Sequence, residues 1–292
     1  MFCFPLLTLF LSFILNGSFI GRYIGHRGSK VISISLCFIT LISSIMIWYE
    51  VIYGGCEAYI NIFGTWISVG SMNINWDVYY DILSVHMLLT VSVVSFAVHC
   101  YSMVYMRSDP HLNLFISYLS LFTFFMVVLV SANNMLGMFI GFEGIGVCSY
   151  LLIGYWSHRL AASKSALKAI VVNRISDGLL LWSIIWLWWY TGTLEYDLIL
   201  LNDSNNISSF LSIALLLGCM ANFDLAHMHL NNNYNFIFII CLCFYTRNPF
   251  IPLDTLSMIQ ALVGLVPSSP WPQSPIFFCK KNRVPSWDMV PC

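Results

Sequence analysis

Long apolar runs are the feature that most restricts how this chain can fold. A helix needs about 20 predominantly apolar residues to cross a bilayer, and the sequence supplies seven runs of roughly that length. They occupy residues 2–21, 31–53, 80–105, 112–131, 135–156, 165–190 and 207–223. Charged residues make up only 9% of the 292, against about 25% in an ordinary soluble domain. The sequence therefore predicts an all-α fold, a polytopic membrane helix bundle with about seven transmembrane helices.

Two segments depart from this helical pattern. Residues 54–79 are rich in Gly, Asn, Trp and β-branched residues with partial alternation, which predicts a short hairpin at the membrane surface after the second helix. Past about Asn222 the sequence loses its helical period, and eight of the ten prolines lie after Arg247. We therefore divide the chain into the first two helices (1–53), the hairpin with helices three and four (54–134), helices five to seven (135–221) and an irregular carboxyl-terminal tail (222–292).

The charged loops alternate in sign. Basic residues follow the first, third and fifth runs, and acidic residues follow the second and sixth. By the positive-inside rule the amino terminus faces outward. The net charge of −1 excludes a broad basic surface of the kind that binds nucleic acid. Ten scattered cysteines without a CxxC spacing predict no metal site and are typical of small buried apolar side chains.

Glu143 is the most informative single residue. It is the only ionisable side chain, apart from Cys and Tyr, between Leu136 and Trp156. A charge near the middle of a membrane span costs roughly 2.5 to 3.5 kcal/mol on insertion scales, so such residues line proton or ion pathways or form packed ion pairs. We expect Glu143 to be a proton site; a static ion pair is the alternative.

The sixth apolar run supplies candidate partners for Glu143. Arg174 and Asp177 are three residues apart on one helix face and can neutralise one another, whereas Lys168 has no partner in its own helix. The short fifth-to-sixth connection keeps these helices close, so Lys168 is the candidate charge partner of Glu143. A nearby cation favours the ionised carboxylate and burial favours the neutral acid, which makes such a group switchable. A purely structural Arg174–Asp177 pair is an open alternative.

Other polar residues of the third run carry a weaker signal. Asp81 lies at the helix start, where a carboxylate interacts favourably with the helix dipole. His86 and His99 lie within the run, and a lone helical histidine is more often a satisfied interior residue than a proton relay.

Glycines surround Glu143. Gly137 and Gly141 have the GxxxG spacing that permits close helix approach, and Gly144 and Gly146 follow the acid. Close packing is one interpretation, and room for water beside the carboxylate is the other. Neither excludes the other.

Two stretches in fixed order carry a family resemblance. They are VHCYSMVYMRSDPHLNLFISYLSLFTFFMVVLVSANNMLGMFIGFEGIGVCSYLLIGYW and LKAIVVNRISDG. Both resemble the chain 5 family of mitochondrial NADH:ubiquinone oxidoreductase, the antiporter-like proton-pumping subunits of respiratory complex I. The amino-terminal helices and the hairpin match more weakly, so the resemblance covers roughly residues 1–221.

The resemblance implies a multi-pass, proton-translocating subunit of the mitochondrial inner membrane. Its implied partners are the other membrane subunits of complex I and the lipid bilayer, with no nucleic acid. It implies no cofactor on this chain, since NADH, flavin, iron-sulfur clusters and ubiquinone are bound by other subunits, which carry the redox chemistry. Glu143 matches the family's essential glutamate in its G-W-E-G motif. Arg174 and Asp177 match the arginine and aspartate of N-R-V-G-D.

The chain also departs from the family pattern. Phe142 replaces the usual tryptophan and Ser176 the usual glycine, whereas the lysine expected in helix seven falls on Asn222. Beyond that position the family motifs are absent. Either the reading frame leaves a coding exon near Met220, or the subunit is shortened or split. The rival functions are a stand-alone cation/proton antiporter subunit and a truncated fragment without pump activity.

Overall fold

The computed structural model describes residues 2–17, 19–54, 59–70, 72–107, 109–196 and 198. The elements are α1 (Phe4–Gly17), α2 (Phe19–Tyr53), β1 (Tyr59–Val69), β2 (Met72–Tyr80), α3 (Ile82–Tyr105), α4 (Leu112–Ser131), α5 (Met135–Ile153) and α6 (Leu160–Thr191). Five of these helices, α2 to α6, are long and apolar enough to cross a membrane. The mostly helical membrane fold and the hairpin after the second helix are therefore confirmed.

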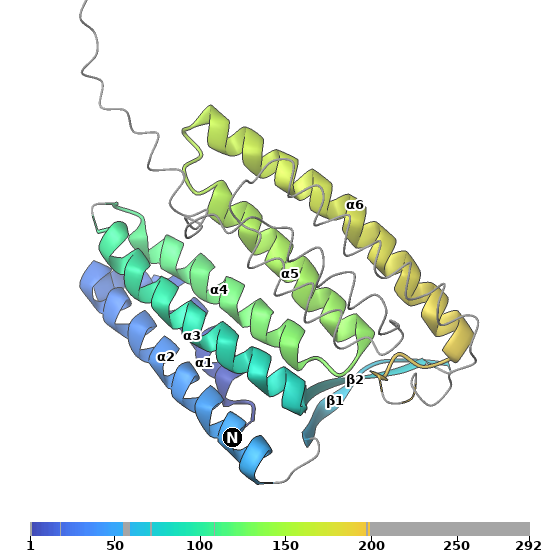
Figure 1. The fold of residues 1–292 in the computed structure, drawn as a ribbon. Helices are drawn as coiled ribbons and strands as arrows, with labels where there is room; N and C mark the ends of the chain where they lie inside the picture. Colours follow the sequence, from blue (N-terminus) through green and yellow to red (C-terminus); the bar gives the residue numbers. More distant parts are fainter. Residues whose placement is uncertain are drawn as a thin grey trace, which may run out of the picture.

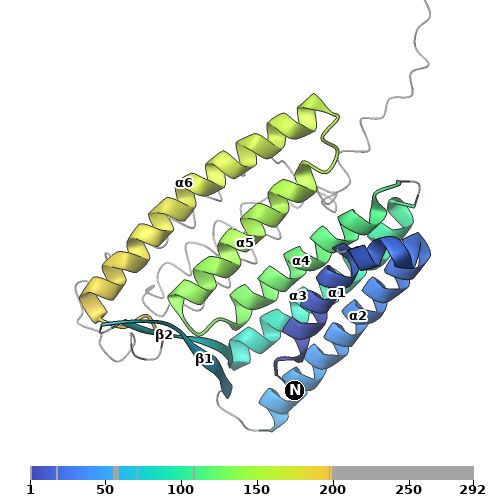
Figure 2. The same cartoon turned by 180° about the vertical axis from the view of Figure 1, so that it is seen from behind.

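The five long helices lie side by side with their axes roughly aligned (Figure 1). The hairpin lies across one end of the bundle, where α3 and α5 begin. Seen from behind, α1 covers the inner helices (Figure 2), and it packs against α2 and α4. The chain therefore places α5 and α6, with the candidate site, beside a compact bundle of α1 to α4.

The first two predicted helices have different bounds from those expected. The first apolar run forms a helix of 14 residues that ends at Gly17, too short to span a bilayer in the usual way. The basic segment 22–30, expected as a loop, is helical within α2. A kink at Gly25 (φ 72°, ψ 176°) interrupts α2, because glycine alone adopts such a backbone without strain.

Two later helices also begin at residues other than those predicted. α6 begins at Leu160, five residues before the predicted start, since Leu160, Ala161 and Ala162 are strong helix formers. α3 begins at Ile82 because Tyr80 ends β2. The predicted seventh helix (207–223), Asn222 and the tail (222–292) lie outside the described residues.

The hairpin is an antiparallel pair whose register runs from Tyr59 opposite Tyr80 to Val69 opposite Met72. Gly70, with φ 59°, lies in its turn. The phenol of Tyr80 donates a hydrogen bond to the carbonyl oxygen of Phe2 (2.8 Å). Burial, with a smaller contribution from Cys3, raises the pKa of Tyr80 well above its usual range. The phenol therefore stays a neutral donor that ties the amino-terminal segment to the sheet.

Asp81 starts α3 as its N-cap, as the sequence predicted. Its side chain accepts from the backbone N–H of Ile82 (2.6 Å), and the hydroxyl of Ser84 accepts from the N–H of Asp81 (2.6 Å). The Asp81 side chain also accepts from the backbone N–H of Ser84, so Asp81 and Ser84 form a capping box, which satisfies N–H groups that have no partner within the helix. Asp81 therefore has a structural role in fixing where the membrane helix leaves the hairpin.

Candidate functional site

Close packing of α5 on α4 positions Glu143. A Cβ atom added to Gly141 would lie 2.8 Å from the Cα of Leu129, and one added to Gly144 would lie 2.4 Å from the ring of Phe125. Both distances are shorter than real Cβ contacts. Gly141 and Gly144 therefore allow the helix approach, whereas a Cβ on Gly137 would meet ordinary contact at 3.5 Å. Packing thus accounts for two of the four glycines around the acid.

A substitution at Gly141 separates this packing role from general helix propensity. We expect Gly141→Ala to lower the free energy of unfolding by roughly 1–3 kcal/mol, because the new methyl group meets the α4 backbone. Gly178→Ala is the matched control, since no described atom lies within 4 Å of its added Cβ, and it should be neutral or stabilise by up to about 1 kcal/mol. Thermal unfolding of the purified chain in detergent, followed by circular dichroism, measures both; equal midpoints for the two variants would refute the packing role.

Glu143 forms an ion pair with a cation of the neighbouring helix. Nη1 of Arg174, on α6, contacts Oε1 of Glu143, on α5. The Arg174 side chain is 56% exposed and the Glu143 side chain 33% exposed within the described part of the chain. Within the described helices the pair is therefore only partly enclosed.

The other two predicted site residues lie on the same helix. Asp177 is buried, with 7% exposure, and interacts electrostatically with Glu143 and Arg174. Lys168 is exposed and lies six residues before Arg174, about 9 Å along the helix axis. The structure therefore brings Glu143, Arg174 and Asp177 together, and the ion pair of Arg174 is with Glu143. The cation in contact with Glu143 is Arg174. The sequence had suggested Lys168 as the charge partner of Glu143.

No metal centre can be assigned in the described ranges. No group of three or more His, Cys, Asp or Glu side chains there could hold a metal ion. The described cysteines Cys3, Cys37, Cys100 and Cys148 are free thiols, and Cys37 and Cys148 are buried, as expected for small apolar side chains.

The structure also shows a polar cluster that the sequence argument missed. The carboxylate of Asp77, on β2, accepts hydrogen bonds from Nδ2 of Asn133 (2.7 Å) and of Asn134 (3.0 Å), in the turn between α4 and α5. The same Nδ2 of Asn134 donates to the carbonyl oxygen of Asn75 (2.8 Å). The predicted runs 112–131 and 135–156 leave only a short connection between them, but it is the pairing of the hairpin that brings Asp77 to this turn.

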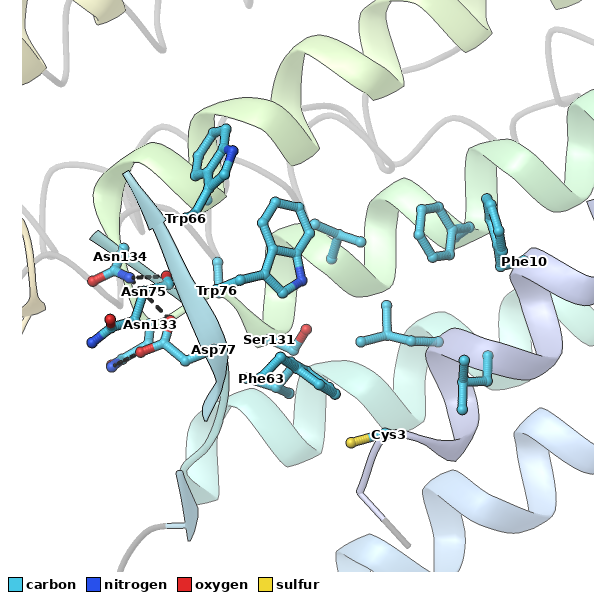
Figure 3. Close-up of a pocket in the computed structure, with 17 residues that line it drawn as sticks. Cys3, Phe10, Phe63, Trp66, Asn75, Trp76, Asp77, Ser131, Asn133 and Asn134 are labelled. Carbon is cyan, nitrogen blue, oxygen red and sulfur yellow. Dashed lines mark hydrogen bonds between the residues drawn. The ribbon is translucent and has the colours of Figure 1, made fainter. Parts of the chain in front are cut away.

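This cluster lies at one end of a cavity of about 250 Å³ (Figure 3). The remaining lining is largely apolar, with Trp76 and Phe63 from the hairpin and Phe10 from α1. Trp66 and Trp76 pack edge to face, with ring centroids 5.5 Å apart. The cluster therefore ties the hairpin to the turn that precedes α5, the helix that carries Glu143.

Comparison with protein families identifies two matching regions. The family described as "NADH-Ubiquinone oxidoreductase (complex I), chain 5 N-terminus" matches residues 66–116. The family described as "NADH:quinone oxidoreductase/Mrp antiporter, TM" matches residues 132–231. Glu143, Lys168, Arg174 and Asp177 all lie inside the second match. That match begins at the α4–α5 turn and so includes the helix pair that forms the site.

Individual relatives agree with these matches. The NADH-ubiquinone oxidoreductase chain 5 of Chlamydomonas reinhardtii is 54% identical over 207 residues, which are 71% of this chain and 37% of the relative. The chain 5 protein of Phytophthora infestans is 47% identical over 195 residues, covering 65% of this chain and 29% of the relative. The chain thus spans about a third of the length of these relatives.

A solved structure supports the fold alone. A chain of the membrane-bound sulfane sulfur reductase, an archaeal respiratory membrane complex, superposes with a TM-score of 0.59 at 17% identity, covering 76% of this chain and 42% of that chain. The helix order and the sequence matches lead to one assignment. The chain is a multi-pass membrane protein and a homologue of NADH-ubiquinone oxidoreductase chain 5, matched over the amino-terminal and antiporter-like membrane regions of that family.

Proposed function

We propose that this chain is a proton-translocating, antiporter-like membrane subunit of NADH:ubiquinone oxidoreductase in the mitochondrial inner membrane. The observation that carries the proposal is the contact between Glu143 and Arg174 inside the region matched by the antiporter family. A carboxylate retained within a membrane helix is a functional candidate by default. Here it has a cationic partner on the next helix and a buried acid nearby.

Each residue has a role in the proposal. Glu143 binds and releases the proton, and Arg174 stabilises its ionised form. Asp177, buried beside both, changes the balance between them through its own charge. Lys168 is a second cation on α6, which can interact electrostatically with charged groups farther along the membrane. In general, burial favours the neutral form of a carboxyl group and a neighbouring cation favours the ionised form.

In this proposal the chain itself binds no prosthetic group. Electrons pass from NADH to ubiquinone on other subunits of the complex. Its partners are those membrane subunits and the surrounding lipid. The predicted seventh span, 207–223, belongs to the proposed architecture.

The test compares respiratory coupling with ion exchange. Mitochondrial membranes containing the chain should show rotenone-sensitive NADH oxidation, and the chain should migrate with the large complex on a native gel. Sodium/proton exchange without NADH would instead support a stand-alone antiporter subunit. Migration of the chain only as a free species would support a fragment without pump activity, and either result would overturn the proposal.

A further inference from the structure

The chain after α6 folds back onto the turn between α4 and α5. Gly192, with φ 74°, ends α6 in the left-handed conformation that favours glycine. Three residues later, Glu195 forms an isolated antiparallel bridge with Asn134, the residue before α5. The end of α6 is thereby fastened to the start of α5, at the hairpin end of the bundle.

The bridge places the side chains of Asn134 and Glu195 next to each other. Its two backbone hydrogen bonds flank this pair, and they run from Met135 N–H to the Leu194 carbonyl oxygen (3.2 Å) and from Tyr196 N–H to that of Asn133 (3.4 Å). This is the non-hydrogen-bonded type of antiparallel pair, in which the Cα atoms are about 4.5 Å apart and the side chains are close.

The orientation of the Asn134 amide is fixed by its two donor contacts. Nδ2 donates to the carbonyl oxygen of Asn75 (2.8 Å) and to Oδ1 of Asp77 (3.0 Å) (Figure 3). Rotating the amide by 180° would turn its oxygen toward those two acceptors. The amide oxygen of Asn134 therefore stays on the other side, where it is buried and receives no hydrogen bond from a described group. Leaving a buried acceptor without a donor is unfavourable.

Glu195 is the neighbouring side chain that can supply this donor. Its Oε1 accepts a hydrogen bond from Nδ2 of Asn75 (3.5 Å), so its carboxyl group belongs to the same polar cluster. An ionised carboxylate only accepts hydrogen bonds, whereas a protonated carboxyl group has one O–H donor. A proton on Oε2 of Glu195 therefore gives the amide oxygen of Asn134 a donor, while Oε1 continues to accept from Asn75.

The second acid of the cluster favours the same state. Asp77 accepts hydrogen bonds from both amides of the α4–α5 turn, which suits an ionised carboxylate. A like charge nearby disfavours ionisation of the Glu195 carboxyl group, and a hydrogen bond made by the neutral acid has the same effect. Tyr196, the next titratable residue, donates its phenol to Sδ of Met138 (3.2 Å).

We propose that Glu195 holds a proton at pH values where an exposed glutamate has lost it, and that it shares this proton with the amide oxygen of Asn134. This is a second proton-binding site, at the hairpin end of α5 and α6. Glu195 is partly exposed, so its proton exchanges with solvent. The proposal does not depend on the proton-translocating function of Glu143, because its readout is the protonation of one carboxyl group.

The test titrates the full chain in phosphatidylcholine nanodiscs by NMR, with ¹³C in the side-chain carboxyl groups of glutamate. The chain has four glutamates, Glu50, Glu57, Glu143 and Glu195, so the signals are few. Glu195→Gln assigns the Glu195 signal by its loss, and Glu195→Asp does so equally, because only glutamate is labelled. Glu50, which is exposed, is the matched control and is assigned with Glu50→Gln.

We expect the titration midpoint of Glu195 to lie at least about one pH unit above that of Glu50, because the charge of Asp77 and the hydrogen bond to Asn134 both favour the neutral acid. A midpoint equal to that of Glu50, or below it, would overturn the proposal.

Two variants of the turn test the acceptor. Asn134→Ala removes the amide oxygen beside Glu195, and α5 keeps its start because the Asn134 side chain makes no capping hydrogen bond. Asn133→Ala is the control, since it also removes an amide that donates to Asp77 (2.7 Å). We expect Asn134→Ala to lower the Glu195 midpoint by at least about half a pH unit, roughly threefold in proton affinity, and Asn133→Ala by less than half as much. Equal shifts, or no shift in Asn134→Ala, would refute the proposed hydrogen bond.

Discussion

Glu143→Gln is expected to abolish proton translocation while leaving the helices in place. Glutamine has nearly the same shape as glutamate, so the contact between α5 and α6 can persist as a neutral hydrogen bond with Arg174. The glutamine amide does not take up or release a proton at physiological pH. Since positioned acid–base groups contribute about 10²- to 10⁴-fold to proton transfer, we expect at least about a hundredfold loss, measured as NADH-driven proton uptake in sealed membrane vesicles.

The matched control for this change is Glu50→Gln. Glu50 is an exposed carboxylate near the end of α2, outside the α5–α6 contact, and its neutral variant should pump as the unmodified chain does. Retained pumping in Glu143→Gln would remove Glu143 from the proton path. Loss of pumping in both variants would mean that the measurement reports assembly rather than proton transfer.

Arg174→Gln has the second largest expected effect. The change removes the cation in contact with Glu143 and keeps a side chain that can form a hydrogen bond. We expect proton uptake to fall about tenfold, since an opposite charge beside a carboxylate is worth roughly a factor of ten or more. Lys168→Gln should lower uptake by less than about threefold, since Lys168 lies outside the ion pair.

The two cation variants decide between two arrangements. A larger loss in Lys168→Gln than in Arg174→Gln would make Lys168 the operating partner of Glu143, with the Arg174 contact a resting state. Arg174→Lys adds a check: it keeps the charge but loses the guanidinium geometry, so it should recover most of the uptake if charge alone matters. Failure of that recovery would assign a role to the shape of the guanidinium.

Long apolar runs predicted most of the helices, because a membrane span needs such a run whatever it packs against. α4 matches its predicted bounds, and the hairpin was found from its composition. The helix boundaries that were predicted wrongly lie where the local backbone geometry, and not hydrophobicity, determines where a helix begins or ends. α1 ends at Gly17, inside an apolar run, and the basic segment 22–30 is helical although it lies outside one, so hydropathy predicted neither. Leu160 extends α6 through helix propensity rather than through an apolar run.

The sequence named the residues of the candidate site, whereas their contacts come from the structure. Glu143 stood out because a charge in an apolar helix is costly, and its neighbours on α6 followed from their charge. Which of those cations meets Glu143 depends on the rotation of α6 about its axis, which the sequence alone does not determine. The Asp77 cluster was invisible for a similar reason, since its partners lie 56 and 57 residues away along the chain.

Infrared difference spectroscopy of the membrane-bound chain tests the central claim most directly. If Glu143 takes up and releases a proton during turnover, addition of NADH should produce a protonated-carboxyl band that shifts in deuterated water and is absent from Glu143→Gln. Arg174→Gln should change the frequency of that band, because the cation in contact with Glu143 is removed. A carboxyl band that persists unchanged in Glu143→Gln would contradict the account, since another acid would be carrying the proton.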